Sequence, residues 1–146
     1  MSGEAKLVSP CGLYCGVCPV HRAGSNPSLA ESIGKLMNMP AEEVKCDGCR
    51  PQQGAVMSRR SSVCETYDCC VNQKKLQFCY QCDDFPCLKL APSVHRAQEL
   101  PHNSKIYNLL LIQRKGEDNF TQQAEKLWRQ YFRGQKPDPG GDLRMG

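Results

Sequence analysis

Apolar residues first recur at helical spacing after Asn26-Pro27, where asparagine is a good N-cap and proline suits the first helical position. Pro40 would end this helix because proline cannot continue the backbone hydrogen bonds. Four apolar residues share the spacing of one buried helix face: Leu29, Ile33, Leu36 and Met37. We therefore expect a helix between the two prolines, with that face in the interior.

The C-terminal third carries the clearest helical pattern. Ser104 can cap a first helix, which Gly116 would end, and the acidic residues Glu117 and Asp118 favour the start of a second. The first helix would bury Ile106, Leu109, Leu110 and Ile112, and the second Phe120, Ala124, Leu127, Trp128 and Tyr131. We expect a helical hairpin over residues 103–134, its aromatic stripe packing in the core rather than lining a ligand pocket. Residues 137–146 are rich in Pro, Gly and Asp and predict a flexible tail.

Between these regions the pattern is weaker. Residues 51–63 are polar and predict a loop. From Val63 to Leu76 a helix is expected, with Cys64, Tyr67 and Val71 on one face and two lysines near its C-terminal end.

Cysteine changes this picture more than any other residue. The chain has 146 residues and 11 cysteines, and ten of them fall into two sets. The first set is Cys11, Cys15, Cys18, Cys46 and Cys49, and the second is Cys64, Cys69, Cys79, Cys82 and Cys87.

Residues 1–9 lack the apolar segment of a secretory signal, so we expect a cytoplasmic protein with reduced thiols. No stretch is apolar enough for a membrane span. The two sets therefore predict metal sites rather than disulfides.

Three Cys-x-x-Cys pairs carry most of this signal: Cys15/Cys18, Cys46/Cys49 and Cys79/Cys82. Two intervening residues let both sulfurs of such a knuckle reach one ion. The first two pairs form the most economical first site, with Cys11 as the spare thiol. The third pair needs two ligands from Cys64, Cys69 and Cys87. We expect Cys70, adjacent to Cys69, to point elsewhere as a buried thiol.

Zinc is the ion that this spacing favours, one in each set, and a [4Fe–4S] cluster is the alternative because it uses the same thiolates. Two zinc ions and eight thiolates would cancel the formal net charge of +4, so that charge is weak support for nucleic-acid binding. His21 lies close to Cys18 in sequence, and we expect it on the surface or behind the ligands. Asp83-Asp84 is interpreted as a solvated turn rather than a catalytic pair.

Three motifs together resemble a family of small cysteine-rich proteins of unknown function from anaerobic archaea and bacteria. They are Cys-Gly-Leu-Tyr-Cys-Gly-Val-Cys-Pro from Cys11, Cys-Asp-Gly-Cys-Arg from Cys46, and Phe-Cys-Tyr-Gln-Cys-Asp-Asp-Phe-Pro-Cys from Phe78. The resemblance extends from Cys11 to about Leu90, and more loosely through the C-terminal helices. It implies a reduced cytoplasm and metal binding by these cysteines, but no reaction.

We expect one domain over residues 1–136 with a small, metal-stabilised α+β fold that is mostly helical. Two knuckle sites within residues 10–88, with short β-ribbons, would pack under the hairpin. The preferred function is a non-enzymatic module in which structural zinc supports a surface for a protein or nucleic acid. Candidate contacts are Arg59-Arg60, Lys74-Lys75 and Arg114-Lys115. An iron–sulfur redox or sensor protein is the first alternative, and a metalloenzyme with an exchangeable metal position is the second. The oligomeric state is left open.

Overall fold

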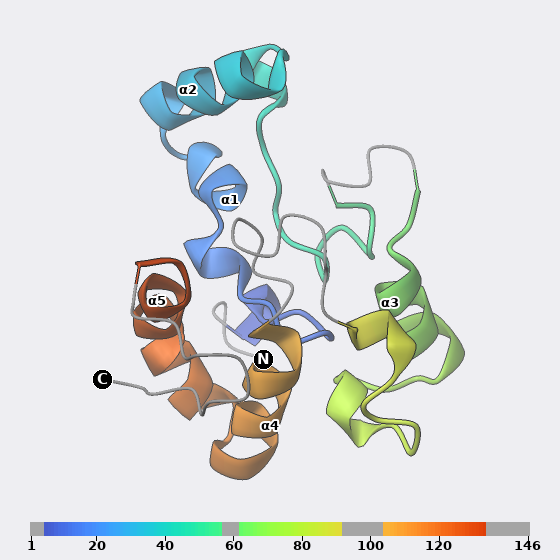
Figure 1. Cartoon of the computed structure of the whole chain (residues 1–146). Helices are drawn as coiled ribbons and strands as arrows, with labels where there is room; N and C mark the ends of the chain where they lie inside the picture. Colours follow the sequence, from blue (N-terminus) through green and yellow to red (C-terminus); the bar gives the residue numbers. More distant parts are fainter. Residues whose placement is uncertain (1–4, 57–61, 92–103, 134–146) are drawn as a thin grey trace.

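The computed structural model describes residues 5–56, 62–91 and 104–133. The elements of this part of the chain are helical (Figure 1). Short 3-10 turns carry the label η, and η5 is a π-helix. In chain order the elements are η1 (Ala5–Leu7), η2 (Cys15–Val17), α1 (Pro19–Ala23), α2 (Pro27–Met37), η3 (Ala41–Glu43), α3 (Glu65–Tyr67), η5 (Asp68–Gln73), η6 (Cys79–Gln81), η7 (Leu88–Leu90), α4 (Lys105–Lys115) and α5 (Glu117–Arg133).

The expected β-ribbons, and with them the α+β class, are not supported. The described residues contain one isolated antiparallel bridge, between Val8 and Tyr14, and no sheet. Two of the knuckles close on themselves instead. The Cys18 N–H donates to the Cys15 carbonyl at 2.9 Å, and the Cys82 N–H donates to the Cys79 carbonyl at 3.2 Å. Because these turns satisfy their own backbone groups, they need no partner strand.

Helix α2 forms where the sequence predicts it. The Asn26 side chain accepts a hydrogen bond from the Leu29 N–H at 3.1 Å, which confirms the predicted cap. The predicted buried face is partly wrong, however, because Leu36 is 86% exposed and Met37 is 37% exposed. The small residues of α2, Ala30 and Gly34, are buried instead.

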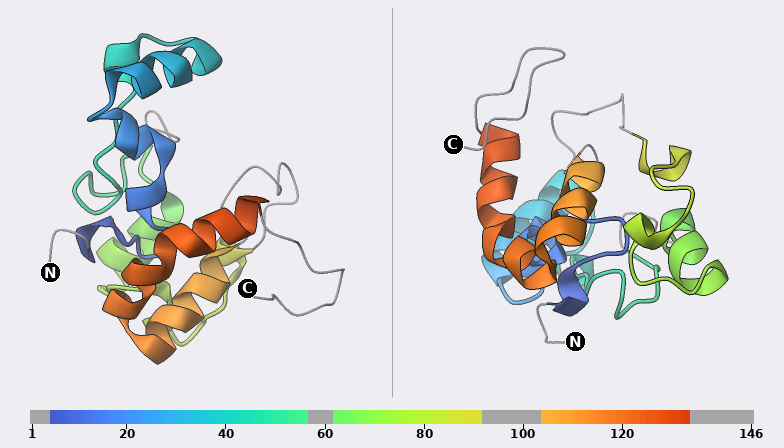
Figure 2. Two further views of the ribbon diagram at one scale, coloured as in Figure 1. Left: turned by 90° about the vertical axis from the view of Figure 1, so that its left-hand side faces the viewer. Right: turned by 90° about the horizontal axis from the view of Figure 1, so that it is seen from below.

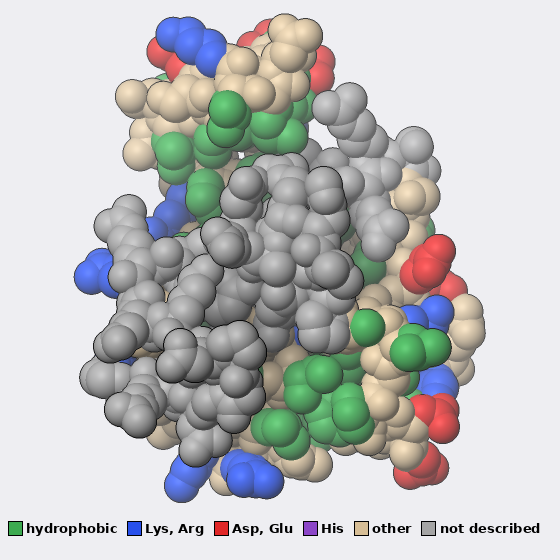
Figure 3. All heavy atoms as spheres, in the orientation of Figure 1, with side chains coloured by type: hydrophobic (Ala, Val, Ile, Leu, Met, Phe, Trp, Pro, Cys, Tyr) green, Lys and Arg blue, Asp and Glu red, His purple; other side chains and the backbone are tan. Residues whose placement is uncertain are grey.

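Close backbone approach explains this difference. A Cβ on Gly34 would lie 2.7 Å from the Met39 carbonyl oxygen, so the chain after the helix folds back directly over the glycine. Ala30 packs with Ala23 and Val44 in a small apolar cluster. Helices α1 and α2 form an arm that stands away from the rest of the molecule (Figures 1 and 2). Figure 3 shows apolar side chains along the lower side of this arm.

The predicted C-terminal hairpin is present as α4 and α5, and its apolar stripe packs in the core. Phe120, Ala124 and Leu127 are buried together with Leu109 and Ile112. Trp128 is half-buried, and the Tyr131 side chain lies outside the description. The same cluster contains residues of the cysteine-bearing segments: Val8, Cys70, Phe78, Cys79 and Leu90. The hairpin and the knuckle regions therefore share one core.

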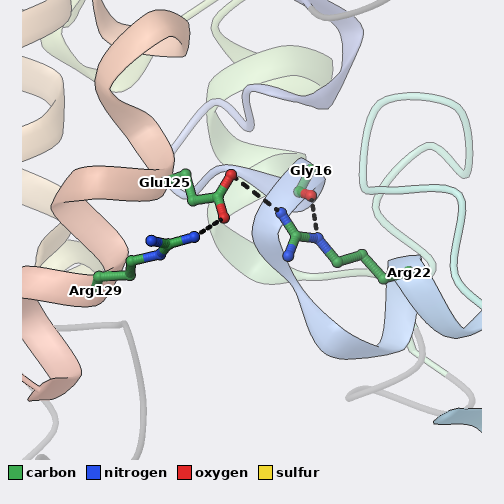
Figure 4. A network of polar contacts seen from close by, with 4 residues as sticks. All are labelled: Gly16, Arg22, Glu125 and Arg129. Atoms are coloured by element: carbon green, nitrogen blue, oxygen red, sulfur yellow. Dashed lines mark hydrogen bonds and ion pairs between the residues drawn. The ribbon is translucent and has the colours of Figure 1, made fainter.

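Two contacts fix the N-terminal knuckle to this hairpin. The Asn108 side chain on α4 donates to the Gly12 carbonyl at 2.9 Å. Arg22 on α1 donates through Nε to the Gly16 carbonyl at 2.9 Å, and its Nη2 lies 3.8 Å from Glu125 on α5 (Figure 4). Glu125 also pairs with Arg129, one helical turn away, at 2.7 Å.

The middle of the chain departs from the expected helix over 63–76. One α-helical turn, α3, passes directly into the π-helix η5, and the helical part ends at Gln73. Residues 51–54 form turns and 55–56 have no regular structure, as expected for a polar loop, and 57–61 lie outside the described residues. So do the predicted tail, 137–146, and the basic pair Arg59-Arg60. No helix in the described ranges combines the length and apolar content needed to cross a bilayer.

Candidate metal sites

The first set of cysteines comes together from two segments far apart in sequence. Cys15 begins η2, and Cys18 caps α1. Gly48, in the second knuckle, faces them: a Cβ built on it would lie 3.4 Å from the Cys15 sulfur. Its φ of +99° is a conformation that glycine adopts without strain, which suits the tight turn of this knuckle. The two knuckles predicted to share an ion therefore lie side by side.

The thiols of this set also influence one another's ionisation. Burial raises the pKa of the Cys15 thiol to about 11, although a hydrogen bond from the Cys49 backbone N–H opposes the shift. The negative charges of ionised Cys18, Cys46 and Cys11 raise it further. Burial is also the main cause that raises the pKa of Cys49, followed by repulsion from Cys15 and Cys11. Thiols that disfavour one another's ionisation in this way would be stabilised as thiolates by a bound cation.

His21 supports the same knuckle from behind. Its Nδ1 lies 2.7 Å from the Cys46 carbonyl oxygen, and since a carbonyl only accepts, Nδ1 carries the proton. The imidazole thus holds the backbone of a predicted ligand and contacts no sulfur through this nitrogen. His95 and His102 lie outside the described residues.

Most of the second set lies around a cavity of about 460 Å³ between η5, η6 and η7. Four of the predicted ligands line it: Cys69, Cys79, Cys82 and Cys87. Cys70 lines it too, whereas Cys64 does not. The Cys64 N–H instead donates to the Gly54 carbonyl at 2.9 Å, and the Gly54 N–H donates to the Cys49 carbonyl at 2.7 Å, which links Cys64 to the first set. Leu76, Phe85 and Leu90 supply the apolar part of the wall.

A lysine at the rim of this cavity was not predicted as part of the site. Lys74 Nζ donates to the Cys82 sulfur at 2.9 Å and to Asp84 Oδ2 at 2.7 Å. The Asp84 carboxylate, followed by Cys82, raises the pKa of Lys74, and the ammonium in turn lowers the pKa of Asp84. Sequence spacing gave no signal of this contact, because Lys74 was interpreted as a helix-terminal cation. Asp84 is exposed, as expected for a solvated turn.

The donor chemistry fits a thiophilic ion. All 11 cysteines are free of disulfide bonds. Thiolate sulfur is the preferred ligand of zinc and of iron–sulfur clusters. As the side chains lie, however, no three donors among the described residues converge closely enough to enclose an ion. Each set is thus a group of neighbouring thiols rather than a closed cage, and the sulfurs would have to approach one another to coordinate a common ion.

Comparison with known proteins places most of the cysteine-bearing chain in one family. A family model described as "Protein of unknown function (DUF3795)" matches residues 7–92. This range includes all 11 cysteines and ends before the α4–α5 hairpin. Searches of the curated proteins and of the solved structures give no match.

Proposed function

The chain belongs to the DUF3795 family, whose function is unknown, and on that premise we propose that it is a metal-binding protein with two structural zinc sites. In the first site, zinc would be held by four of five thiolates: Cys11, Cys15, Cys18, Cys46 and Cys49. In the second, the knuckle Cys79/Cys82 would supply two of the ligands. Bound zinc supplies positive charge that neutralises the thiolates and a cross-link between distant segments.

The meeting of the first two knuckles is the observation that carries this proposal. Cys18 and Cys46 are separated by 27 residues that form a separate arm, yet Gly48 packs against the Cys15 sulfur. Without an ion, burial and the neighbouring thiols oppose the ionisation of Cys15 and Cys49. With an ion, the same gathering provides tetrahedral thiolate ligands at low cost in chain entropy.

The surroundings would support metal binding without contributing ligands. The Cys49 backbone N–H donates to Cys15, and Lys74 donates to the Cys82 sulfur. Hydrogen bonds of this kind reduce the charge on a thiolate site and orient its ligands. His21 would hold the Cys46 backbone in place through its bond to the carbonyl.

We propose a protein partner for the surface that these sites stabilise. Leu88, next to Cys87, is 93% exposed and lines the second cavity beside Phe85 and Leu90, so the apolar wall of the cavity continues into solvent. A continuous apolar surface of this kind favours a protein contact over nucleic acid. The basic pair Lys74-Lys75 is weakened as a nucleic-acid contact, since Lys74 is engaged by Asp84.

An iron–sulfur protein is the second candidate, and the size of the cavity favours it. A space of about 460 Å³ bordered by five cysteines exceeds what one ion needs. A [4Fe–4S] cluster with four thiolate ligands would occupy more of it.

Elemental analysis of protein purified without oxygen tests the proposal. We expect two zinc ions per chain and a colourless solution. If the protein instead contains iron and inorganic sulfide and absorbs in the visible range, the iron–sulfur candidate is correct and the zinc proposal is wrong. A chain that contains no metal, and takes up none when zinc or iron is supplied, would overturn both.

A further inference from the structure

Two adjacent cysteines, Cys69 and Cys70, both face the cavity beside the second knuckle. Cys70 is only 3% exposed, and its sulfur lies 3.6 Å from the Leu76 carbonyl oxygen. Successive residues on an α-helix point about 100° apart, which is why adjacent cysteines are not expected to serve one site. Both thiols nevertheless contribute to the same wall.

The π-helix η5 accounts for this placement. The Lys74 N–H donates to the Cys69 carbonyl at 3.0 Å, and the Leu76 N–H donates to the Cys70 carbonyl at 2.9 Å. Both bonds span more residues than the i to i+4 bond of an α-helix. The widened turn leaves Cys69 and Cys70 on the cavity side, and such local widening is frequent at functional sites.

Cys70 also touches the knuckle itself. Its side chain is hydrogen-bonded to that of Cys79, and both are buried, at 3% and 9% exposure. Cys64, by contrast, does not line the cavity. Its N–H donates to the Gly54 carbonyl at 2.9 Å, and the Gly54 N–H donates to the Cys49 carbonyl at 2.7 Å, so the backbone of Cys64 is linked to the first set. The sequence spacing instead gave Cys64 to the second set and left Cys70 outside both sets.

We propose that Cys70 is a ligand of the second metal site, together with Cys79 and Cys82, and that Cys64 belongs with the first set. This inference rests on the proposed function, because it assumes that the second set binds an ion. The fourth ligand is one of the two other thiols that line the cavity, Cys69 or Cys87. An ion held in this way would join the π-helix to the knuckle η6 directly.

Cadmium substitution tests the assignment on the intact chain. Cadmium takes the place of zinc at thiolate sites, and its NMR-active isotope couples to the Hβ protons of each cysteine that binds it. In the cadmium-loaded wild-type chain, we expect Cys70, Cys79 and Cys82 to couple to the same cadmium signal. Cys64 should couple either to the other signal or to none.

The outcomes separate this inference from the proposed function. Two thiolate-bound cadmium ions, with Cys64 on the signal of Cys79 or with Cys70 coupled to none, would overturn the inference and leave the proposed function intact. A chain that takes up no cadmium would overturn both.

A matched pair of variants adds a second measurement. Cys70→Ser should weaken cadmium binding at the signal of Cys79 at least tenfold, whereas Cys64→Ser should leave that site unchanged. The reverse order would contradict the assignment.

Discussion

The guanidinium carbon of Arg50 lies 4.9 Å from the centroid of the Phe78 ring. Arg50 directly follows the knuckle Cys46/Cys49, and Phe78 directly precedes the knuckle Cys79/Cys82. The same guanidinium donates through Nε to the Val8 carbonyl at 2.7 Å and through Nη2 to the Gln77 carbonyl at 2.6 Å. One side chain therefore joins both cysteine regions to the N-terminal segment, independently of any metal.

Arg50→Lys should destabilise the fold by about 2 kcal/mol, because lysine cannot reproduce the forked hydrogen bonds and stacks less well on the ring. Chemical denaturation under constant metal conditions measures the free energy of unfolding. Arg114→Lys, on the exposed side of α4, is the matched control and should change it by less than about 0.5 kcal/mol. Equal effects of the two substitutions would contradict the bridging role of Arg50.

Gly12→Ala should be more damaging than Gly116→Ala. Both glycines have a positive φ, +89° and +86°, so alanine is strained at either position by about 1–3 kcal/mol. At Gly12 a Cβ would also lie 2.8 Å from the Lys105 carbonyl oxygen, whereas nothing lies within 4 Å at Gly116.

The clash would force α4 away from the first knuckle and lower the free energy of unfolding by about a further 1–3 kcal/mol. Melting temperatures of the two variants give the comparison. If Gly12→Ala melts no lower than Gly116→Ala, then α4 does not rest on this turn.

Lys74→Met should lower the zinc affinity of the second site about tenfold, since it removes the ammonium that donates to the Cys82 sulfur. Competition with a chromophoric chelator measures this affinity. Lys75→Met changes the neighbouring exposed lysine in the same way and should have no such effect. A shift that appears equally in both variants would reflect net charge alone.

Glu117→Gln tests the contribution of the Glu117 charge, because glutamine keeps the length of the side chain and cannot ionise. Burial is the first cause that raises the pKa of Glu117, and its Oε1 is buried without a hydrogen-bond partner among the described residues. A group with a raised folded-state pKa contributes stability below its unfolded pKa and loses that contribution as the pH rises through the folded value.

The variant should therefore melt higher than wild type at neutral pH, and the difference should shrink as the pH falls through the raised pKa of Glu117 towards the ordinary pKa of glutamate. A pH series of melting temperatures measures it, with Glu31→Gln, at an exposed position on α2, as the control. A difference that grows towards acid would have the wrong sign.

Local signals in the sequence located several helices correctly. Asn26 caps α2, and Gly116 ends α4 with a positive φ, because both rules depend only on neighbouring residues. The burial of Phe120, Ala124 and Leu127 followed from their spacing. The exposure of Leu36 did not, because it depends on the return of the chain over Gly34.

In the candidate sites, too, the features that depend on local spacing were predictable and those that depend on distant parts of the chain were not. Spacing alone grouped Cys15 and Cys18 with the knuckle that contains Gly48, and the structure places them together. Spacing could not reveal that a π-helix brings Cys70 to the second cavity, since this depends on backbone bonds from Lys74 and Leu76. Nor could it reveal Lys74 beside Cys82, a contact made only after the chain reverses between them.

Thermal unfolding of anaerobically purified protein, with and without a strong chelator, tests the central claim most directly. If zinc held by the two cysteine sets completes the core, removing it should abolish the cooperative transition, because a structural zinc contributes on the order of 10 kcal/mol. Returning zinc should restore the transition. A metal-free chain that melts cooperatively at the temperature of the untreated protein would contradict the account.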